Sequence, residues 1–292
     1  MTIAWLAIVN PKARYSRSTH WRHTIAERLK RELGAHVVFT RHPGHAAELA
    51  ATSKAEGLAV FGGDGTVAEA VNGMDLDRQR LLLLAGGTGN GLARDLGLSS
   101  MEAAFAAARA DRLRSLDLMR VSFQSQNQTY SRLAISTASV GYAAKVTFLA
   151  NHYFKFLGEL CYPLAATLQA ARQTTFPITV QLDENTSEKQ RLSNVMVNNT
   201  RHAGNFSAFR QSDPGDGRIE VLLARANFGQ QFLHNLAVLT GTYFYATAAE
   251  ITAHTLTLNL PGPQLLMIDG ELWENIIWAR FDVLPGRLRC VA

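Results

Sequence analysis

The chain has 292 residues, of which 47% are hydrophobic and 18% are charged, and its formal net charge is +5. This composition predicts a globular protein with two domains or one large domain, and it excludes low-complexity and solenoid-repeat chains. Because the sequence holds only Cys161 and Cys290, it also excludes a disulfide framework and a cysteine-based metal cluster.

The same features give expectations about location and partners. No apolar run reaches about 18 residues, so we expect no membrane-spanning segment. The first apolar run, 3–9, has no basic residue before it and ends at Asn10-Pro11, so we expect no signal peptide and a cytoplasmic protein. The positive charge suits anionic partners. The basic segment 12–23 is either a solvated helix face or a contact for phosphates or an anionic membrane.

Short apolar runs alternate with helical patterns up to about residue 111. We expect strands at 3–9, 36–41, 58–62 and 80–85, and helices at 19–33, 45–57, 67–74, 92–98 and 99–111. Strands that alternate with helices in this way imply a parallel sheet covered on both faces.

The pattern becomes β-rich after that point. We expect hairpins over 112–140 and 176–199, a helical region over 142–173 interrupted at Pro163, a helix at 228–244, and strands at 218–226, 251–260, 264–270 and 279–292. The predicted domains are therefore 1–118 and 119–280, and the last strand, 281–292, is a candidate to complete the first domain.

Two glycine-rich segments stand where a predicted strand meets a predicted helix. They are Gly62-Gly63-Asp64-Gly65-Thr66 and Gly86-Gly87-Thr88-Gly89-Asn90-Gly91. Helix N-termini attract anions, and glycine lets the backbone approach a phosphate closely. The carboxyl ends of parallel strands share one edge, so the two loops predict a polyphosphate cradle, with plain tight turns as the alternative.

Familiar nucleotide and hydrolase motifs are absent from the sequence. It contains no G-x-x-x-x-G-K-[ST], neither loop completes G-x-G-x-x-G, and no G-x-S-x-G occurs. Asp64 is unusual beside phosphates because like charges repel, and a bound Mg²⁺ would resolve that conflict. The residues alone therefore suggest a Mg²⁺–nucleotide site for phosphoryl transfer.

The motifs resemble those of the diacylglycerol kinase catalytic family, which includes bacterial lipid kinases and sphingosine kinases. GGDGTVAEAVNGM (62–74) is similar to its G-G-D-G-T-x-x-E-x-x-N-G signature, and LDLMRV, SVGYAAKV, VNNTRHAGNF, DPGDGRIEV and IDGELW follow in the family's order. NAD kinases, which share G-G-D-G-T, are more distant, since their downstream motifs have no counterpart here. The resemblance implies an α/β fold: a nucleotide-binding domain with a parallel sheet, then a β-sandwich-like domain, with the active site in the cleft between.

The resemblance also implies roles for individual residues, with ATP and Mg²⁺ as cofactors. Glu271 matches the family's general base, Asp64 is the rival base, and Asp117 matches a buried acid that joins Asp64 near Mg²⁺. An exposed Glu271 in a plain hairpin turn is the alternative. The implied nucleotide-binding residues are Asn10, Pro11, Thr40, Gly62, Gly63, Asp64, Gly65, Thr66, Glu69, Thr88 and Asn90.

Two further metal expectations follow from the resemblance. Asp213, Asp216 and Arg218 correspond to a second, structural metal loop, for which a Pro-Gly turn without metal is the alternative. Gly91 stands where the family has an acid near Mg²⁺, so we expect weaker metal binding, replacement by Asp95, or a site that is no longer catalytic. Asp95 lies one helical turn beyond Gly91, and we expect it to face elsewhere.

The resemblance implies an ATP-dependent lipid kinase that phosphorylates a hydroxyl of diacylglycerol, phosphatidylglycerol or a sphingoid base. The alternatives are a kinase of a soluble metabolite such as NAD, and a non-catalytic relative that senses nucleotide or lipid. We expect a reversible, peripheral contact with a membrane and no nucleic-acid partner, and we leave homodimer formation open. Residues 153–157 (YFKFL) are expected to form a docking face or part of a lipid cleft, with a buried core helix as the alternative.

Overall fold

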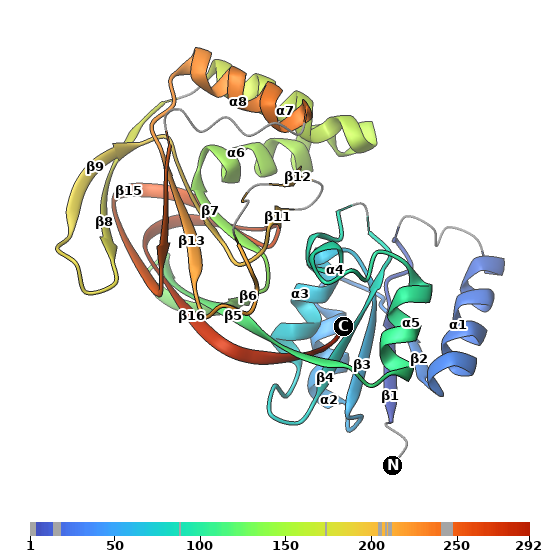
Figure 1. The fold of residues 1–292 in the computed structure, drawn as a ribbon. Coiled ribbons are helices and arrows are strands. Elements are labelled where there is room, and N and C mark those ends of the chain that lie inside the picture. Colours follow the sequence, from blue (N-terminus) through green and yellow to red (C-terminus); the bar gives the residue numbers. More distant parts are fainter. Residues whose placement is uncertain are drawn as a thin grey trace. The chain divides into compact units, whose positions relative to one another are not determined.

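A computed structural model describes residues 4–13, 19–87, 89–172, 174–203, 206–207, 209, 212–240 and 248–292. They divide into two compact units (Figure 1). Unit 1 comprises Met1–Leu118 and Pro285–Ala292, and unit 2 comprises Met119–Leu284. Two long strands, β5 (Leu113–Ser125) and β16 (Glu271–Val291), each contribute residues to both units and pair with each other.

Unit 1 is built on a parallel sheet. Its strands lie in the order β4 (Arg80–Ala85), β3 (Gly57–Gly62), β1 (Trp5–Val9), β2 (His36–Phe39). Each strand begins and ends within two residues of its predicted position. β3 is buried along its whole length and β4 is buried at its centre, as expected of a sheet covered on both faces.

Five helices surround this sheet in the described part of unit 1. They are α1 (Thr19–Leu33), α2 (His45–Thr52), α3 (Asp64–Gly73), α4 (Gly91–Asp95) and α5 (Met101–Arg109). α3 begins three residues earlier than predicted, so Asp64 is its first residue rather than part of the loop. A carboxylate is favourable there because it faces the positive end of the helix dipole.

The end of the chain supplies a further strand to unit 1. Cys290 and Val291 of β16 pair in parallel with Leu81 and Leu82 of β4. The Asp117 carboxylate of β5 accepts the backbone N–H of Gly286 over 2.6 Å, which fastens the returning segment to unit 1.

Unit 2 is a mostly antiparallel β structure. Its main path runs β14 (Ala248–Ala253), β13 (Ile219–Ala224), β10 (Asn194–Asn198), β7 (Thr137–Gly141), β15 (Thr255–Ile268), β16. β6 (Gln128–Ala134) pairs with β5, and β8 (Phe176–Leu182) pairs with β15 and with β9 (Glu188–Leu192). The short strands β11 (His202–Ala203) and β12 (Phe206–Ser207) form a separate pair.

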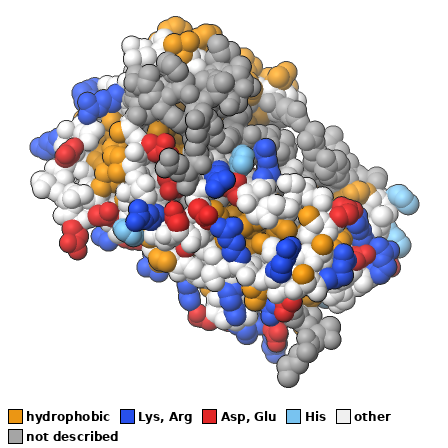
Figure 2. All heavy atoms as spheres, in the orientation of Figure 1, with side chains coloured by type: hydrophobic (Ala, Val, Ile, Leu, Met, Phe, Trp, Pro, Cys, Tyr) orange, Lys and Arg blue, Asp and Glu red, His pale blue; other side chains and the backbone are white. Residues whose placement is uncertain are grey.

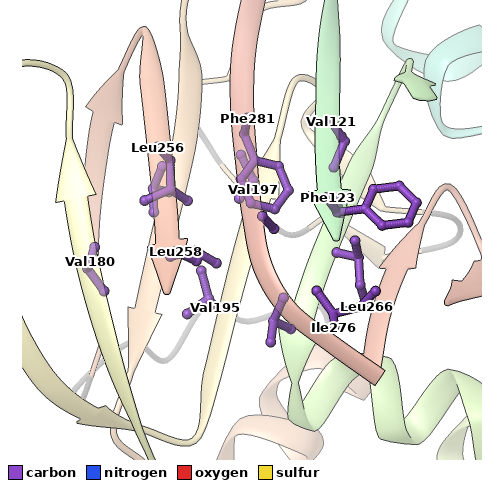
Figure 3. Close-up of a cluster of buried hydrophobic side chains, with 14 of the residues drawn as sticks. Val121, Phe123, Val180, Val195, Val197, Leu256, Leu258, Leu266, Ile276 and Phe281 are labelled. Atoms are coloured by element: carbon purple, nitrogen blue, oxygen red, sulfur yellow. The ribbon is translucent and has the colours of Figure 1, made fainter. Parts of the chain in front are cut away.

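The core of unit 2 collects side chains from strands far apart in the sequence. Figure 3 shows Phe123 of β5, Val195 and Val197 of β10, Leu256 of β15 and Phe281 of β16 within one cluster. All five are buried. This cluster holds unit 2 together mainly through the hydrophobic effect.

Several predicted strands of unit 2 are divided in the structure. The predicted strand 129–140 is two strands, β6 and β7, which have different neighbours. The predicted strand 191–199 is split at Ser193 between β9 and β10, and 251–260 is split at His254 between β14 and β15. Each predicted run is apolar enough to read as one strand, but its two halves pair with different partners.

Helices form a separate layer of unit 2. α6 (Tyr142–Leu149) continues through a π-helical turn, η1 (Ala150–Phe154), and a 3₁₀ segment, η2 (Lys155–Leu160), into α7 (Cys161–Ala171). The predicted interruption at Pro163 is wrong. The break occurs at Gly158, with φ 60°, whereas Pro163 lies in the first turn of α7, where a missing N–H costs little.

α8 (Phe228–Thr240) packs against this layer. The Tyr142 hydroxyl donates to Ala166 O over 2.7 Å, and the Asn235 amide of α8 donates to the same carbonyl and to the Tyr142 hydroxyl. Within the described residues, no helix has the length and apolar character needed to cross a membrane.

Candidate active site

The first group of predicted site residues lies at the carboxyl edge of the unit 1 sheet. Asn10 follows β1, and its amide donates to Thr66 Oγ1 over 2.8 Å while its Oδ1 accepts the backbone N–H of Lys12. Thr40 follows β2, and its N–H donates to Val9 O over 2.9 Å. The structure therefore brings Asn10, Thr40 and the start of α3 to one edge, where ligands of parallel α/β sheets bind.

The two glycine loops touch each other backbone to backbone at this edge. A Cβ built on Gly87 would lie 2.3 Å from Cα of Gly63, a distance that no side chain tolerates. A Cβ on Gly62 would lie 2.7 Å from the Thr66 Cβ. These glycines are needed because the chain packs closely around them, whether or not a ligand also approaches their backbone.

Asn90 closes the second loop. Its Oδ1 accepts the N–H of Gly87 over 2.8 Å, its Nδ2 donates to Gly87 O over 2.7 Å, and its backbone is left-handed, with φ 52°. The resemblance assigned Asn90 to the nucleotide, but both functional groups of its amide bind the loop itself. Thr88, also assigned to the nucleotide, lies outside the described residues.

Asp64 connects the two loops. Burial raises the pKa of its carboxyl group, and hydrogen bonds from the backbone N–H groups of Gly91 and Asn90 oppose that rise. Although Asp64 is the first residue of α3, its carboxyl group therefore faces the N-terminus of α4. Gly91, the first residue of α4, stands where the family has an acid. The charge of Asp95 adds a smaller rise to the pKa of Asp64. That Asp95 faces away from the site stays a prediction.

The surroundings of Asp64 suit a phosphate and a cation. Asp64 and Asn90 border a small pocket with Gly62 and Gly63. A Cβ on Gly65 would meet no atom within 4 Å, and Gly63, the N-cap of α3, brings no side chain to cap that helix. The backbone N–H groups at the start of a helix can bind phosphate oxygens. A carboxyl group that is costly to ionise by itself can bind the metal ion that accompanies the phosphates.

Three other predicted residues lie in unit 1. Pro11 and Glu69 are half-buried, Pro11 beside Asn10 and Glu69 in α3. Asp117 is 2% exposed, and one of its oxygens binds Gly286 N–H, so it holds the C-terminal return. Whether Asp117 also serves a metal stays a prediction.

The predicted base, Glu271, is the first residue of β16 in unit 2. Asp269 and Gly270, with φ 46° and 90°, form a two-residue turn that pairs Glu271 with Ile268 in register. The Glu271 side chain is exposed. This geometry is common to a general base on a hairpin tip and to a plain turn, so the role of Glu271 remains a prediction.

Asp269 anchors that hairpin. Its carboxylate accepts the backbone N–H groups of Ile135, Ser136 and Thr137 over 2.7, 3.0 and 2.9 Å. Its own N–H donates to Thr137 O over 2.8 Å. Sequence analysis missed this residue because an Asp before Gly reads as a turn former, and only the tertiary contact shows the three donors.

The motif VNNT (197–200) binds the segment 135–137, which supplies the three N–H donors to Asp269. Thr137 Oγ1 donates to Asn198 Oδ1 over 2.5 Å, and the N–H of Asn199 donates to Ser136 O over 2.8 Å. The hydroxyls of Ser136 and Thr200 are 2.7 Å apart. Asn198, Asn199 and Thr200 are at most 1% exposed, so this motif is structural and fixes the loop to which Asp269 binds.

The predicted structural metal loop, 213–218, is a pair of side-chain turns. Asp213 Oδ1 accepts Gly215 N–H over 3.1 Å, and Asp216 Oδ1 accepts Arg218 N–H over 3.0 Å. Nearby Glu220 is 3% exposed, and its Oε2 has no hydrogen-bond partner among the described residues. Burial raises the Glu220 pKa, and the charges of Asp216 and Glu250 raise it further, so a hard cation would suit this loop.

In the described parts of both units, one group of three side chains has the spacing of a metal site, and it contains none of the predicted residues. His42, His45 and Glu48 bring one donor atom each within 4.8 Å of one another. His45 Nδ1 already accepts the N–H of Arg41 over 3.1 Å, so this ring nitrogen is engaged.

Comparison with known proteins agrees with both units. Residues 4–121 match the family model described as "Diacylglycerol kinase catalytic domain". Residues 136–292 match "YegS C-terminal NAD kinase beta sandwich-like domain". A Bacillus subtilis (strain 168) protein named "Putative lipid kinase YtlR" is 25% identical over 237 residues, which cover 75% of this chain and 76% of that protein.

Solved structures show the same fold. A crystal structure of "a putative diacylglycerol kinase from Bacillus anthracis str. Sterne" has a TM-score of 0.79 at 20% identity and covers 100% of this chain and 96% of its own. A second structure, "A putative diacylglycerol kinase from Bacillus anthracis str. Sterne", has a TM-score of 0.77 at 20% identity, covering 99% and 96%. The predicted α/β unit followed by a β-sandwich-like unit is thereby confirmed.

The two family models together account for nearly the whole chain, and the sequence motifs, the fold and the relatives agree. The chain belongs to the diacylglycerol kinase catalytic family, in the form that carries a YegS-type C-terminal β-sandwich domain.

Proposed function

We propose that this protein is an ATP-dependent, Mg²⁺-requiring kinase that phosphorylates a lipid hydroxyl. The observation that carries the proposal is the backbone contact between Gly63 and Gly87, with Asp64 hydrogen-bonded across to Asn90 and Gly91 at the carboxyl edge of a parallel sheet. Family membership supports a kinase, and the name of the Bacillus subtilis relative supports a lipid acceptor.

Unit 1 would hold the nucleotide. The N-terminus of α3 and the Gly62–Thr66 loop would bind phosphate oxygens, while Asn10 fixes the loop through Thr66 and Thr40 borders the same edge. Mg²⁺ bound with ATP supplies charge neutralisation for phosphoryl transfer. Asp64 would approach the cation from the first loop, and Asp95, whose charge acts on Asp64, would take the place of the family's missing acid.

Unit 2 would supply the proton acceptor. Glu271 would take the proton of the lipid hydroxyl as that oxygen bonds to the terminal phosphorus of ATP and the bond from this phosphorus to ADP breaks, so that ADP leaves. Asp269 would hold the turn that presents Glu271, through its three bonds to 135–137. The loop Asp213–Arg218 would bind a second cation that neutralises Asp216 and Glu220.

A soluble-metabolite kinase is the second candidate, and the description of the second family model, which mentions NAD kinase, favours it. A test that separates the candidates supplies radiolabelled ATP with total lipid extract in one reaction and NAD in another, and identifies the product by mass spectrometry. A phosphorylated lipid that forms with the wild type and not with Glu271→Gln supports the proposal. Phosphorylated NAD supports the second candidate, and ATP binding without turnover identifies a non-catalytic relative.

A further inference from the structure

The helical layer of unit 2 exposes an unusual number of large apolar side chains. Of the ten large hydrophobic residues with exposed side chains in the described part of the chain, eight lie in 153–164 and 228–233. We call these eight the apolar edge: Tyr153, Phe156, Leu160, Tyr162, Leu164, Phe228, Phe232 and Leu233. Figure 2 shows hydrophobic side chains at the top of the view, in the region where α7 and α8 lie in Figure 1.

The first strip of the apolar edge follows the irregular segment between α6 and α7. Phe156 is 81% exposed, Leu160 66% and Tyr153 61%. A core helix over 153–157 is therefore wrong, because Tyr153 and Phe156 are exposed and, of its aromatic side chains, only Phe154 packs against the core of the layer. The layer does have a core, but it is formed by other residues, among them Val146, Ala150 and Ala165.

The second strip lies on α8. Gln231 and Asn235 form its inner side, since Gln231 is 7% exposed and Asn235 binds Tyr142 and Ala166 O. Phe228, Phe232 and Leu233 of the same helix are 56%, 46% and 49% exposed. A helix with polar anchors inside and aromatic residues outside is unusual for a surface that faces only water.

The charges of the same segments are mostly positive. Residues 142–172 contain Lys145, Lys155 and Arg172 and one acid, Glu159, while 225–240 contains Arg225 and no acid. Arg172 and Arg225 are exposed. Aromatic and leucine side chains accompanied by basic residues, with few acids, are the combination that binds the interface of an anionic bilayer.

We propose that the apolar edge docks unit 2 onto the surface of an anionic lipid bilayer, with both strips inserted at the headgroup level. This deepens the proposed function and rests on it, since a lipid acceptor resides in such a bilayer. Basic residues provide the long-range attraction, which salt screens, and the apolar side chains provide the short-range binding, which salt does not weaken.

The test is sedimentation of the full chain with phosphatidylcholine vesicles and with vesicles that also contain phosphatidylglycerol. We expect the wild type to bind the anionic vesicles more tightly, and we expect high salt to reduce that preference. The variants Phe156→Ser/Leu160→Ser and Phe228→Ser/Phe232→Ser should each weaken binding by about tenfold. The control variant Leu113→Ser/Ile277→Ser removes exposed apolar residues outside the edge and should bind like the wild type.

Turnover of a short-chain diacylglycerol that dissolves as a monomer separates this proposal from the proposed function. Edge variants that lose vesicle binding but keep this turnover support the docking surface. Wild-type vesicle binding by the edge variants overturns it, even when turnover is observed. Edge-dependent binding without turnover of any lipid leaves the docking surface standing and contradicts the lipid kinase. If the edge variants instead convert a dimer into a monomer in analytical ultracentrifugation and still bind vesicles, the edge is a self-association surface and the proposal fails.

Discussion

The surroundings of Asp64 make the ionisation of its carboxyl group unfavourable. Burial raises its pKa above the ordinary 3.8, and the backbone N–H groups of Asn90 and Gly91 offset only part of this effect. The folded state therefore binds this proton more tightly than the unfolded chain, so stability is lost as pH rises through the raised pKa. A cation beside Asp64 would reverse that loss, because it stabilises the ionised form.

The first prediction concerns the competition between Mg²⁺ and the proton at Asp64. We expect the Mg²⁺-dependent rise in melting temperature, measured with an ATP analogue present, to shrink as pH falls through the raised pKa of Asp64. In Asp64→Asn the rise should be small and independent of pH over the same range. A Mg²⁺ response that is the same in both proteins removes Asp64 from the metal site.

The second prediction concerns Glu271. Glu271→Gln should keep ATP affinity and melting temperature, because the side chain is exposed, and should lose on the order of 10²–10⁴ in turnover as a missing general base. Isothermal titration with an ATP analogue and steady-state rates measure the two quantities. Near wild-type turnover would show that the hairpin carries a plain turn residue.

The third prediction concerns Gly91 and Asp95. Gly91 lies in α4 with a helical backbone, so Gly91→Asp needs no strained φ, and it places a second carboxylate beside Asp64. Without metal the variant should be less stable at neutral pH than at acidic pH, and it should reach half-maximal activity at a lower Mg²⁺ concentration than the wild type.

Asp95→Asn is the matched control for that variant, since it removes the acid that already influences Asp64. It should raise the Mg²⁺ requirement if Asp95 replaces the family's acid. An unchanged requirement in both variants would mean that the three-acid arrangement does not apply to this chain.

At the scale of elements, the hairpin Ile268–Glu271 depends on a single side chain. Asp269 accepts three backbone N–H groups that otherwise have to find partners in a largely buried loop. The neighbouring VNNT motif is a poor replacement, because most of its side-chain polar atoms are already bonded to one another and to 135–137. The orientation of Glu271 is thus set by residues of three separate segments: 268–271, 135–137 and 197–200.

The fourth prediction tests this anchor. Asp269→Ala should destabilise the protein by about 2–4 kcal/mol, because it leaves charge-assisted donors unpaired. Asp269→Asn keeps one acceptor oxygen, so its free energy of unfolding should fall by less than that of Asp269→Ala. Both variants should lower kcat while ATP affinity stays near wild type. A fall in stability with an unchanged kcat in the remaining folded protein would show that Asp269 supports the fold alone.

The elements of unit 1 were predictable because its strands are short, continuous apolar runs bounded by glycine or polar residues. The strand boundaries of unit 2 were harder to predict. The breaks at Ile135-Ser136, Ser193 and His254 carry no glycine or proline, and tertiary pairing alone decides where one strand ends. In the site, the glycine loops were visible in the sequence. The role of Asn90 depends on how its own loop folds back onto it, and the role of Asp269 depends on backbone donors supplied by a distant segment.

At the scale of the whole molecule, unit 1 is completed by residues from the other end of the chain. Two acids contact the returning segment: Asp117, which is buried and binds Gly286 N–H, and Asp77, which is exposed and pairs with Arg287. The Arg287 guanidinium lowers the pKa of Asp77, but solvent screens this pair.

The fifth prediction uses this contrast. Asp117→Ala should lower the free energy of unfolding by about 1–3 kcal/mol, because the Gly286 N–H loses the acceptor that the buried Asp117 carboxylate supplies. Asp77→Ala, which removes an exposed ion pair to the same segment, should change stability little. Urea unfolding without nucleotide measures both, so a metal role of Asp117 does not enter. Equal effects of the two substitutions would mean that the returning segment is held by its strand pairing alone.

The return of β16 to β4 has a consequence for how the protein is made. A ribosome completes all of unit 2 before it adds Cys290 and Val291, the residues that pair with β4. During translation the earlier segments therefore wait with one sheet edge unfilled, and a chain released early would keep that edge exposed to chaperones and proteases. Completion of the unit 1 sheet is thus coupled to completion of synthesis.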